Sequence, residues 1–259
     1  MNHVLIGCDF FVRRDNVLEQ FNEYVSNYDM DDYDIKYKYN HSIRVRKICE
    51  ALAQLLNLNE EDTYIITTIG LLHDIGRFEQ KKLVGKFSDK KFDHADYGAM
   101  ILFKEGLIEK FNVDTKYYDI MEFAIRNHSR YQIEETDDER KLFFTKLIRD
   151  ADKLDIFDAY TYLHAYSFSD VVGDVTNEVA IQFKKHEPIN IKIKKNRADA
   201  LLITIAFVYD INFIESLKII SEQNYLDELY KTLKDGEKYK QYFECAKDYI
   251  KERIDTDAR

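Results

Sequence analysis

A mostly apolar stretch, residues 64–72, ends directly on a histidine and an aspartate, His73 and Asp74. A helix that is apolar on all sides is typical of a protein interior, so this one carries an imidazole and a carboxylate into the core. Burying such groups without a partner is costly. Because imidazole and carboxylate are ligands of Zn, Fe, Mn and Ni, the doublet predicts a buried metal site. Gly76 is expected to end the helix, and Arg77 adds a fixed positive charge beside it.

The composition indicates a globular, all-helical protein. Only eight of the 259 residues are Gly and one is Pro, and these are the residues that most disfavour a helix interior. The net charge of −10 disfavours binding of polymeric nucleic acid or of anionic membranes. No apolar run is long enough to span a bilayer. Three widely spaced cysteines and an N-terminus without a signal-peptide pattern predict reduced thiols and a cytoplasmic location.

Apolar residues recur with helical spacing over five segments, which we expect to be helices: 35–56, 60–74, 93–105, 116–127 and 138–159. Histidines lie on the apolar stripes of four of these segments, or directly after them, and are therefore expected to point inward. They are His41, His73, His94 and His128. The stretch 77–93 is predicted to be a polar loop, either a lid over the site or a solvated connector.

Acidic residues lie amid apolar ones in the last of these segments. Asp150 and Asp152 both follow apolar residues at helical spacing, so the period alone does not decide which carboxylate faces the core. A single inward histidine is usually a satisfied core residue. Four inward histidines together with aspartates are hard to satisfy separately, whereas a helical bundle brings such residues together in one metal site.

The chain changes character after residue 168. Residues 181–197 alternate apolar and basic side chains, with six Lys or Arg against one Glu. This alternation is compatible with a short strand or hairpin, and the basic patch is either a solvated face or an attraction for an anionic substrate. We expect an N-terminal helical lead over 1–34, a metal-binding core over 35–168, and a C-terminal extension over 169–259 that packs on the core as one domain.

The order of these residues resembles the HD-domain superfamily of metal-dependent phosphohydrolases. The pattern of that superfamily is a His, a His-Asp doublet and a distant Asp within Ala-Asp-(Lys or Arg)-Leu, which is similar to His41, the doublet at residues 73–74 and the Ala-Asp-Lys-Leu of residues 151–154. The resemblance covers roughly residues 35–160 and favours Asp152 over Asp150. It implies an all-α helical bundle, here followed by a C-terminal helical extension.

Two further histidines resemble those of subgroups that hold two or more metals, including the HD-GYP class of cyclic-dinucleotide phosphodiesterases. Residues 73–77, His-Asp-Ile-Gly-Arg, are similar to the His-Asp-x-Gly-Lys of that class, and residues 94–98, His-Ala-Asp-Tyr-Gly, to its His-x-x-x-Gly. The Gly-Tyr-Pro signature is absent, since the only proline is Pro188. This departure speaks against a cyclic-dinucleotide assignment.

The resemblance implies a centre of two divalent transition-metal ions, Fe, Mn or Ni, with Zn or Mg as alternatives. Asp74 would bridge the two ions. One site would be completed by His41, His73 and Asp152, and the other by His94 and His128. A metal-activated water would attack phosphorus, and Arg77 would stabilise the developing charge.

The expected function is hydrolysis of a phosphate monoester or diester of a small molecule, with a nucleotide as the substrate class. Besides Arg77, the candidates for contacting phosphate are Arg126, Arg130 and Lys153. Two alternatives stay open: an oxidative enzyme of the HD fold with a di-iron centre, and a non-catalytic module that senses a nucleotide. The complete set of six ligands favours catalysis over sensing.

Overall fold

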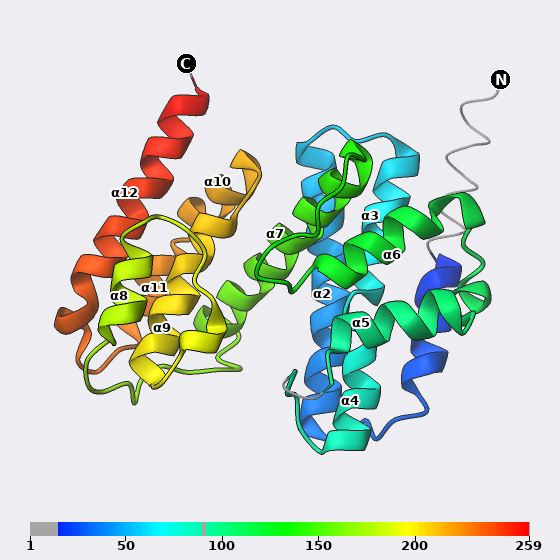
Figure 1. The fold of residues 1–259 in the computed structure, drawn as a ribbon, viewed down its shortest axis with the longest axis horizontal. Helices are drawn as coiled ribbons and strands as arrows, with labels where there is room; N and C mark the ends of the chain where they lie inside the picture. Colours follow the sequence, from blue (N-terminus) through cyan, green and yellow to red (C-terminus); the bar gives the residue numbers. More distant parts are fainter. Residues whose placement is uncertain (1–14, 90–91, 259) are drawn as a thin grey trace. The chain divides into compact units, whose positions relative to one another are not determined.

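The computed structural model describes residues 15–89 and 92–258, and over these residues every regular element is helical (Figure 1). The expected all-α fold is therefore confirmed. No described helix has the length and apolar character needed to cross a membrane. The chain divides into two compact units, Met1–Asp152 and Lys153–Arg259. The predicted helical lead lies partly outside the described residues, and its residues 15–25 are helical. The expected boundary at residue 168 and the packing of the extension stay predictions.

The first unit is built from helices that, apart from α4, follow the predicted segments closely. In chain order they are α2 (Tyr33–Leu55), α3 (Glu60–Leu72), α4 (Gly76–Val84), α5 (His94–Ala99), α6 (Tyr118–Asn127) and the first part of α7 (Glu139–Thr161). Helices α2 and α3 pack side by side, and α5 packs on both α4 and α6 (Figure 1). A π-helical segment, Met100–Lys104, continues α5.

Polar side chains at the helix starts explain where these helices begin. The Asp32 carboxylate accepts hydrogen bonds from the backbone N–H groups of the first turn of α2, and Asn59 and Asp93 do the same for α3 and α5. Such N-caps satisfy donors that have no partner within the helix. Three acidic residues in the first turn of α3 also interact favourably with the positive end of the helix dipole.

The predicted loop over 77–93 is wrong in its first half, where α4 forms a helix of nine residues. Although the sequence of α4 is mostly polar, two of its side chains, Phe78 and Gln80, are completely buried, both 0% exposed. Phe78 packs edge-on against Phe21 and Tyr24 of the preceding helical segment. The helix ends at Gly85, whose φ of 76° lies in the left-handed region that favours glycine at a helix C-terminus.

Two glycines let α4 and α5 approach each other backbone to backbone. A Cβ on Gly76 would overlap the carbonyl oxygen of His94 and would lie 2.9 Å from the Gly98 nitrogen. A Cβ on Gly98 would lie 3.3 Å from the Gly76 nitrogen. This contact holds the turn after α3 against the first turn of α5, and so brings His73 and Asp74 near His94.

After the end of α7, the described part of the second unit contains five α-helices and some short 3₁₀ segments. The α-helices are α8 (Asn177–Phe183), α9 (Arg197–Ile205), α10 (Ile214–Glu222), α11 (Tyr225–Lys231) and α12 (Lys240–Asp257). Helix α12 packs on α9, α10 and α11. The strand or hairpin considered for residues 181–197 is wrong, because these residues end α8 and then form a 3₁₀ turn at Ile191–Ile193. Asn190 caps that turn, and Ile191 is 62% exposed, so the alternation corresponds to no buried sheet face.

We expect Gly76→Ala to lower the free energy of unfolding by about 1–3 kcal/mol, the usual cost of overpacking a tight contact. Gly98→Ala places its methyl group on the other side of the same contact, where the nearest atom is 3.3 Å away. This variant should therefore lose less free energy of unfolding than Gly76→Ala. Urea unfolding of both variants, followed by circular dichroism, checks this order. An equal or larger loss in Gly98→Ala would contradict the account of the contact.

Candidate metal centre

The structure brings together all six side chains predicted as metal ligands, which come from five different helices or their ends. His41 projects from α2, and the doublet His73 and Asp74 follows α3 directly. His94 is the first residue of α5, His128 follows the last residue of α6, and Asp152 lies in α7. The four histidines and Asp74 are at most 2% exposed.

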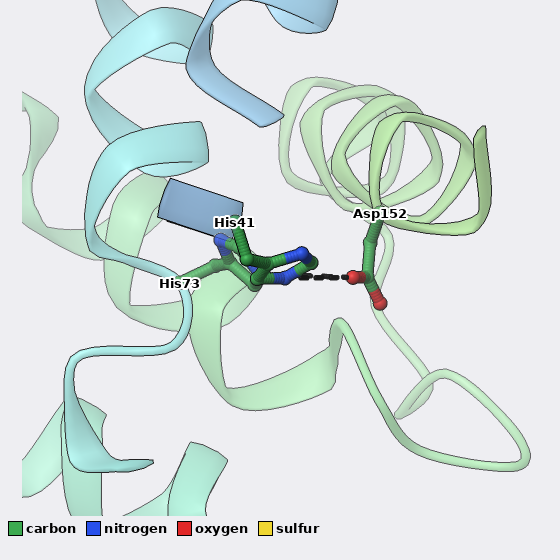
Figure 2. Close-up of side chains that lie close together, drawn as sticks. All are labelled: His41, His73 and Asp152. Carbon is green, nitrogen blue, oxygen red and sulfur yellow. Dashed lines mark hydrogen bonds and ion pairs between the residues drawn. The ribbon is translucent and has the colours of Figure 1, made fainter. Parts of the chain in front are cut away.

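One group of donors consists of His41, His73 and Asp152. The Nε2 atom of His41 lies 3.2 Å from Nε2 of His73 and 3.3 Å from Oδ1 of Asp152. Nε2 of His73 lies 3.8 Å from the same carboxylate oxygen. Figure 2 shows both imidazole rings beside the Asp152 carboxylate. These three donor atoms all lie within 4.8 Å of one another, close enough to hold one metal ion.

A second group lies on the other side of Asp74. Nε2 of His94 is 3.2 Å from Nε2 of His128 and 3.1 Å from Oδ1 of Asp74. Nε2 of His128 is 3.6 Å from the same Oδ1 atom. His73, Asp74 and His128 also offer donor atoms within 4.8 Å of one another, so the two groups adjoin.

The two oxygens of Asp74 face different histidine pairs. Oδ1 is directed to His94 and His128, whereas Oδ2 lies 3.4 Å from Nε2 of His41 and 3.7 Å from Nε2 of His73. A carboxylate that presents one oxygen to each of two donor groups has the arrangement of a bridging ligand. Asp150, the other candidate acid of α7, is also fully buried, and it belongs to neither donor group.

The hydrogen bonds of the histidines fit metal binding. Nδ1 of His73 lies 2.8 Å from the carbonyl oxygen of Gly70, and Nδ1 of His128 lies 2.7 Å from that of Ile125. Because a carbonyl only accepts, each Nδ1 carries the proton, and in the neutral ring Nε2 then offers a lone pair. Each buried lone pair faces an oxygen of Asp74 and the Nε2 atom of another histidine. A cation is the partner that satisfies them, and a hydrogen-bonded Nδ1 is the usual support of a metal-binding histidine.

Comparison with known families agrees with this geometry. A family model described as HD domain matches residues 39–156. This part of the chain is an HD domain. The HD superfamily consists in general of metal-dependent hydrolases that bind divalent ions, so the resemblance seen in the sequence is confirmed at this level. No curated protein and no solved structure matches the chain.

Electrostatics keeps three donors of the HD centre, His73, Asp74 and Asp152, in the protonation states that bind a metal. Burial lowers the pKa of His73 from 6.5 to about 3, so this ring is neutral near pH 7. Burial would raise the pKa of Asp74, but the Lys38 ammonium and the neighbouring histidines hold it well below its usual range. Burial would also raise the pKa of Asp152, but its contact with His41 holds this pKa below its usual range. Burial and Arg77 lower the pKa of His94, but Asp74 and Asp89 raise it above its ordinary value.

Lys38 is a member of the HD centre that sequence analysis missed. Its Nζ atom lies 2.5 Å from Oδ2 of Asp74, and its side chain is 14% exposed. Lys38 precedes His41 by three residues, which places both side chains on one face of α2. This spacing of three residues is the sequence signal that could have placed Lys38 beside His41.

Asp89 is a second residue that sequence analysis missed. Its carboxylate binds Arg77 through two hydrogen bonds of 2.8 and 3.1 Å, and Oδ1 also accepts from Nδ1 of His94 at 2.8 Å. Gln80 donates to the same oxygen and accepts from Arg77. Asp89 therefore orients the ring of His94 and the Arg77 guanidinium together. Asp89 lies in a loop, where the sequence has no helical spacing of apolar residues, so no sequence pattern predicted its position at the centre.

The other three predicted phosphate contacts are engaged with carboxylates. Arg126 and Arg130 both pair with Glu134, and Arg130 also pairs with Asp96 at 2.8 Å. The Nζ atom of Lys153 lies 2.7 Å from Asp210. Arg77 is different, because its Nε atom lies 3.7 Å from Oδ1 of Asp74 and is buried with no hydrogen-bond partner among the described residues.

We expect the metal-free protein to lose stability as the pH falls from 7 to 5. An unfolded histidine takes up a proton below about pH 6.5, whereas folded His73 stays neutral down to about pH 3. The unfolded state then binds more protons, so the free energy of unfolding falls with pH, by up to about 1.4 kcal/mol per pH unit for one group.

Urea unfolding in the presence of a chelator, at pH 7 and pH 5, measures this loss for the wild type and for His73→Gln. The raised pKa of His94 makes the folded state more stable at low pH and so opposes this loss. Because both proteins contain His94, the difference between their pH dependences reports on His73. The loss should be smaller in His73→Gln. An identical pH dependence in both proteins would show that His73 is not held neutral by burial.

Proposed function

We propose that the protein hydrolyses a phosphate ester of a small molecule, with a nucleotide as the substrate class. The observation that supports this most strongly is the arrangement of Asp74, whose two oxygens each face a separate pair of histidines. This arrangement suits two adjacent divalent ions, and two-metal sites are typical of phosphoester hydrolysis. The proposal places the enzyme in the cytoplasm, where Cys49 and Cys245, both free thiols, stay reduced.

Two ions would be held by residues that the structure brings together. His41, His73 and Asp152 would hold one, His94 and His128 the other, and Asp74 would be shared. Divalent ions such as Fe, Mn or Ni would supply an activated water and polarise the phosphoryl oxygens. The hydrogen bonds of His73 and His128 to backbone carbonyls fix the rings and keep their Nε2 atoms directed to the centre.

Arg77 would bind the phosphoryl group through its unsatisfied Nε–H. The two hydrogen bonds to Asp89 hold the guanidinium plane, while Nε remains directed toward Asp74. A positioned donor beside the reacting phosphorus stabilises the negative charge that grows in the transition state. Because Asp89 also binds His94, one carboxylate aligns the donor with the metal site.

Lys38 would supply a second positive charge. Without a metal ion its ammonium neutralises Asp74 Oδ2 at 2.5 Å. Ions bound at the centre would take over this role and leave the ammonium available to an anionic substrate. The Nζ atom of Lys38 and the guanidinium of Arg77 lie 5.9 and 5.8 Å from the centre of the Phe87 ring, so the two cations border the same side chain.

We expect Arg77→Gln to lower kcat for metal-dependent hydrolysis by about 10²-fold, the usual loss when one such donor is removed. Arg140→Gln is a matched control, because Arg140 is also paired with carboxylates, Glu61 and Asp62, but at the opposite end of α3. It should keep its activity within about twofold. The measurement is release of inorganic phosphate or nucleoside monophosphate from a panel of nucleotides, with Mn²⁺ added.

Three outcomes of this assay separate the candidate functions. Turnover that needs metal and is equal in air and under argon supports the hydrolase. Turnover that needs both retained iron and oxygen would instead identify the oxidative alternative. Tight nucleotide binding without turnover under any metal would identify a sensing module and contradict the proposal. An equal loss in Arg77→Gln and Arg140→Gln would contradict the role of Arg77.

A further inference from the structure

The second unit contains a cavity of about 610 Å³ beside the start of α9. Its walls come from the end of α7 with the loop that follows, and from residues 194–200. The size lies within the range of pockets that hold one small molecule. All of its lining residues belong to the second unit, whereas the HD centre is built from residues of the first.

The charge of this cavity is positive although the protein is acidic. Three cations line it, Lys194, Lys195 and Arg197, and no carboxylate is among the lining residues that the structure describes. They belong to the basic segment 181–197, in a chain of net charge −10. A local concentration of one charge within a concave site attracts ligands of the opposite charge.

The cations are available to a ligand. Lys194 is exposed and has no ion-pair partner among residues 15–89 and 92–258. Lys195 and Arg197 pair with Glu178 and Asp170, but all four side chains are at least 55% exposed. Exposed ion pairs of this kind contribute little free energy, so an anionic ligand can replace the carboxylates.

Aromatic side chains also line the cavity. Tyr160 stacks on Phe168 with ring centres 4.6 Å apart, and Tyr166 packs against Tyr160 at 5.4 Å. Phe168 is 3% exposed and forms the base of this group, whereas Tyr166 is 40% exposed. An exposed tyrosine held by a second ring offers a face on which a planar ligand can stack, as nucleobases do on aromatic side chains.

We propose that this cavity is a second binding site, separate from the HD centre, for a mononucleotide. The phosphates bind Lys194 and Lys195, and the base stacks on Tyr166. The combination of cations and an aromatic face selects a ligand that is both anionic and planar, and the volume accommodates one nucleotide rather than a polymer. This inference does not depend on the hydrolytic function, because it uses no residue of the HD centre.

The test is isothermal titration of the full-length protein with ADP, in the presence of a chelator so that no metal ion at the HD centre binds phosphate. We expect Lys194→Glu to weaken ADP binding about tenfold or more, as for loss of a charge-assisted hydrogen bond. Lys184→Glu is the matched control, because Lys184 is exposed in the same basic segment and does not line the cavity. It should bind ADP with unchanged affinity, and so should Asp74→Ala.

The two halves of the ligand are tested separately. Tyr166→Ala should also weaken ADP binding, and neither inorganic phosphate nor adenosine should bind as tightly as ADP. Circular dichroism confirms that each variant is folded. Equal weakening by Lys194→Glu and Lys184→Glu would show only a general charge effect and overturn the proposal. Loss of binding in Asp74→Ala alone would place the nucleotide at the HD centre and also overturn it.

Discussion

A single buried carboxylate, Asp74, is the point at which side chains from several helices of the first unit meet. A charged carboxylate that is 2% exposed is stable only when cations and hydrogen-bond donors surround it. Lys38 of α2 is one such cation. The Nε2 atoms of four histidines, from α2, α5 and the ends of α3 and α6, also lie 3.1–3.7 Å from the Asp74 oxygens, where bound metal ions would supply the remaining positive charge. The close approach of Gly76 in α4 and Gly98 in α5 holds the turn after α3 against the start of α5. The chemistry of the centre therefore depends on this one side chain, and the helix packing places the other donors around it.

The histidines and the helices that carry them could be predicted because both follow one rule. An apolar stripe faces the core, so a histidine on the stripe is carried inward with it. Burial alone does not identify the metal ligand among the acids of α7. Asp150 and Asp152 both lie amid apolar residues, and Asp150 is completely buried although it belongs to neither donor group. The family pattern favoured Asp152, and the structure places its oxygen 3.3 Å from His41.

Other features could not be read from the sequence because they depend on tertiary contacts. Helix α4 has a polar sequence, and its helical state is supported by the burial of Phe78 and Gln80. Asp89 precedes His94 by five residues in a loop, where only the folded chain brings it to Arg77. The alternating residues 189–193 have the period of a strand, but residues 15–89 and 92–258 form no strand to pair with them. A local cap at Asn190 instead begins a 3₁₀ helix at Ile191–Ile193.

The central claim is that Asp74 joins two metal sites, and the number of ions retained per chain tests it most directly. The protein and its variants are loaded with Mn²⁺, desalted and measured by elemental analysis. The account predicts two ions in the wild type, one in His41→Ala and in His94→Ala, and none in Asp74→Ala. His164→Asn, which changes a histidine of the second unit, should retain two. Wild-type metal content in Asp74→Ala would contradict the account.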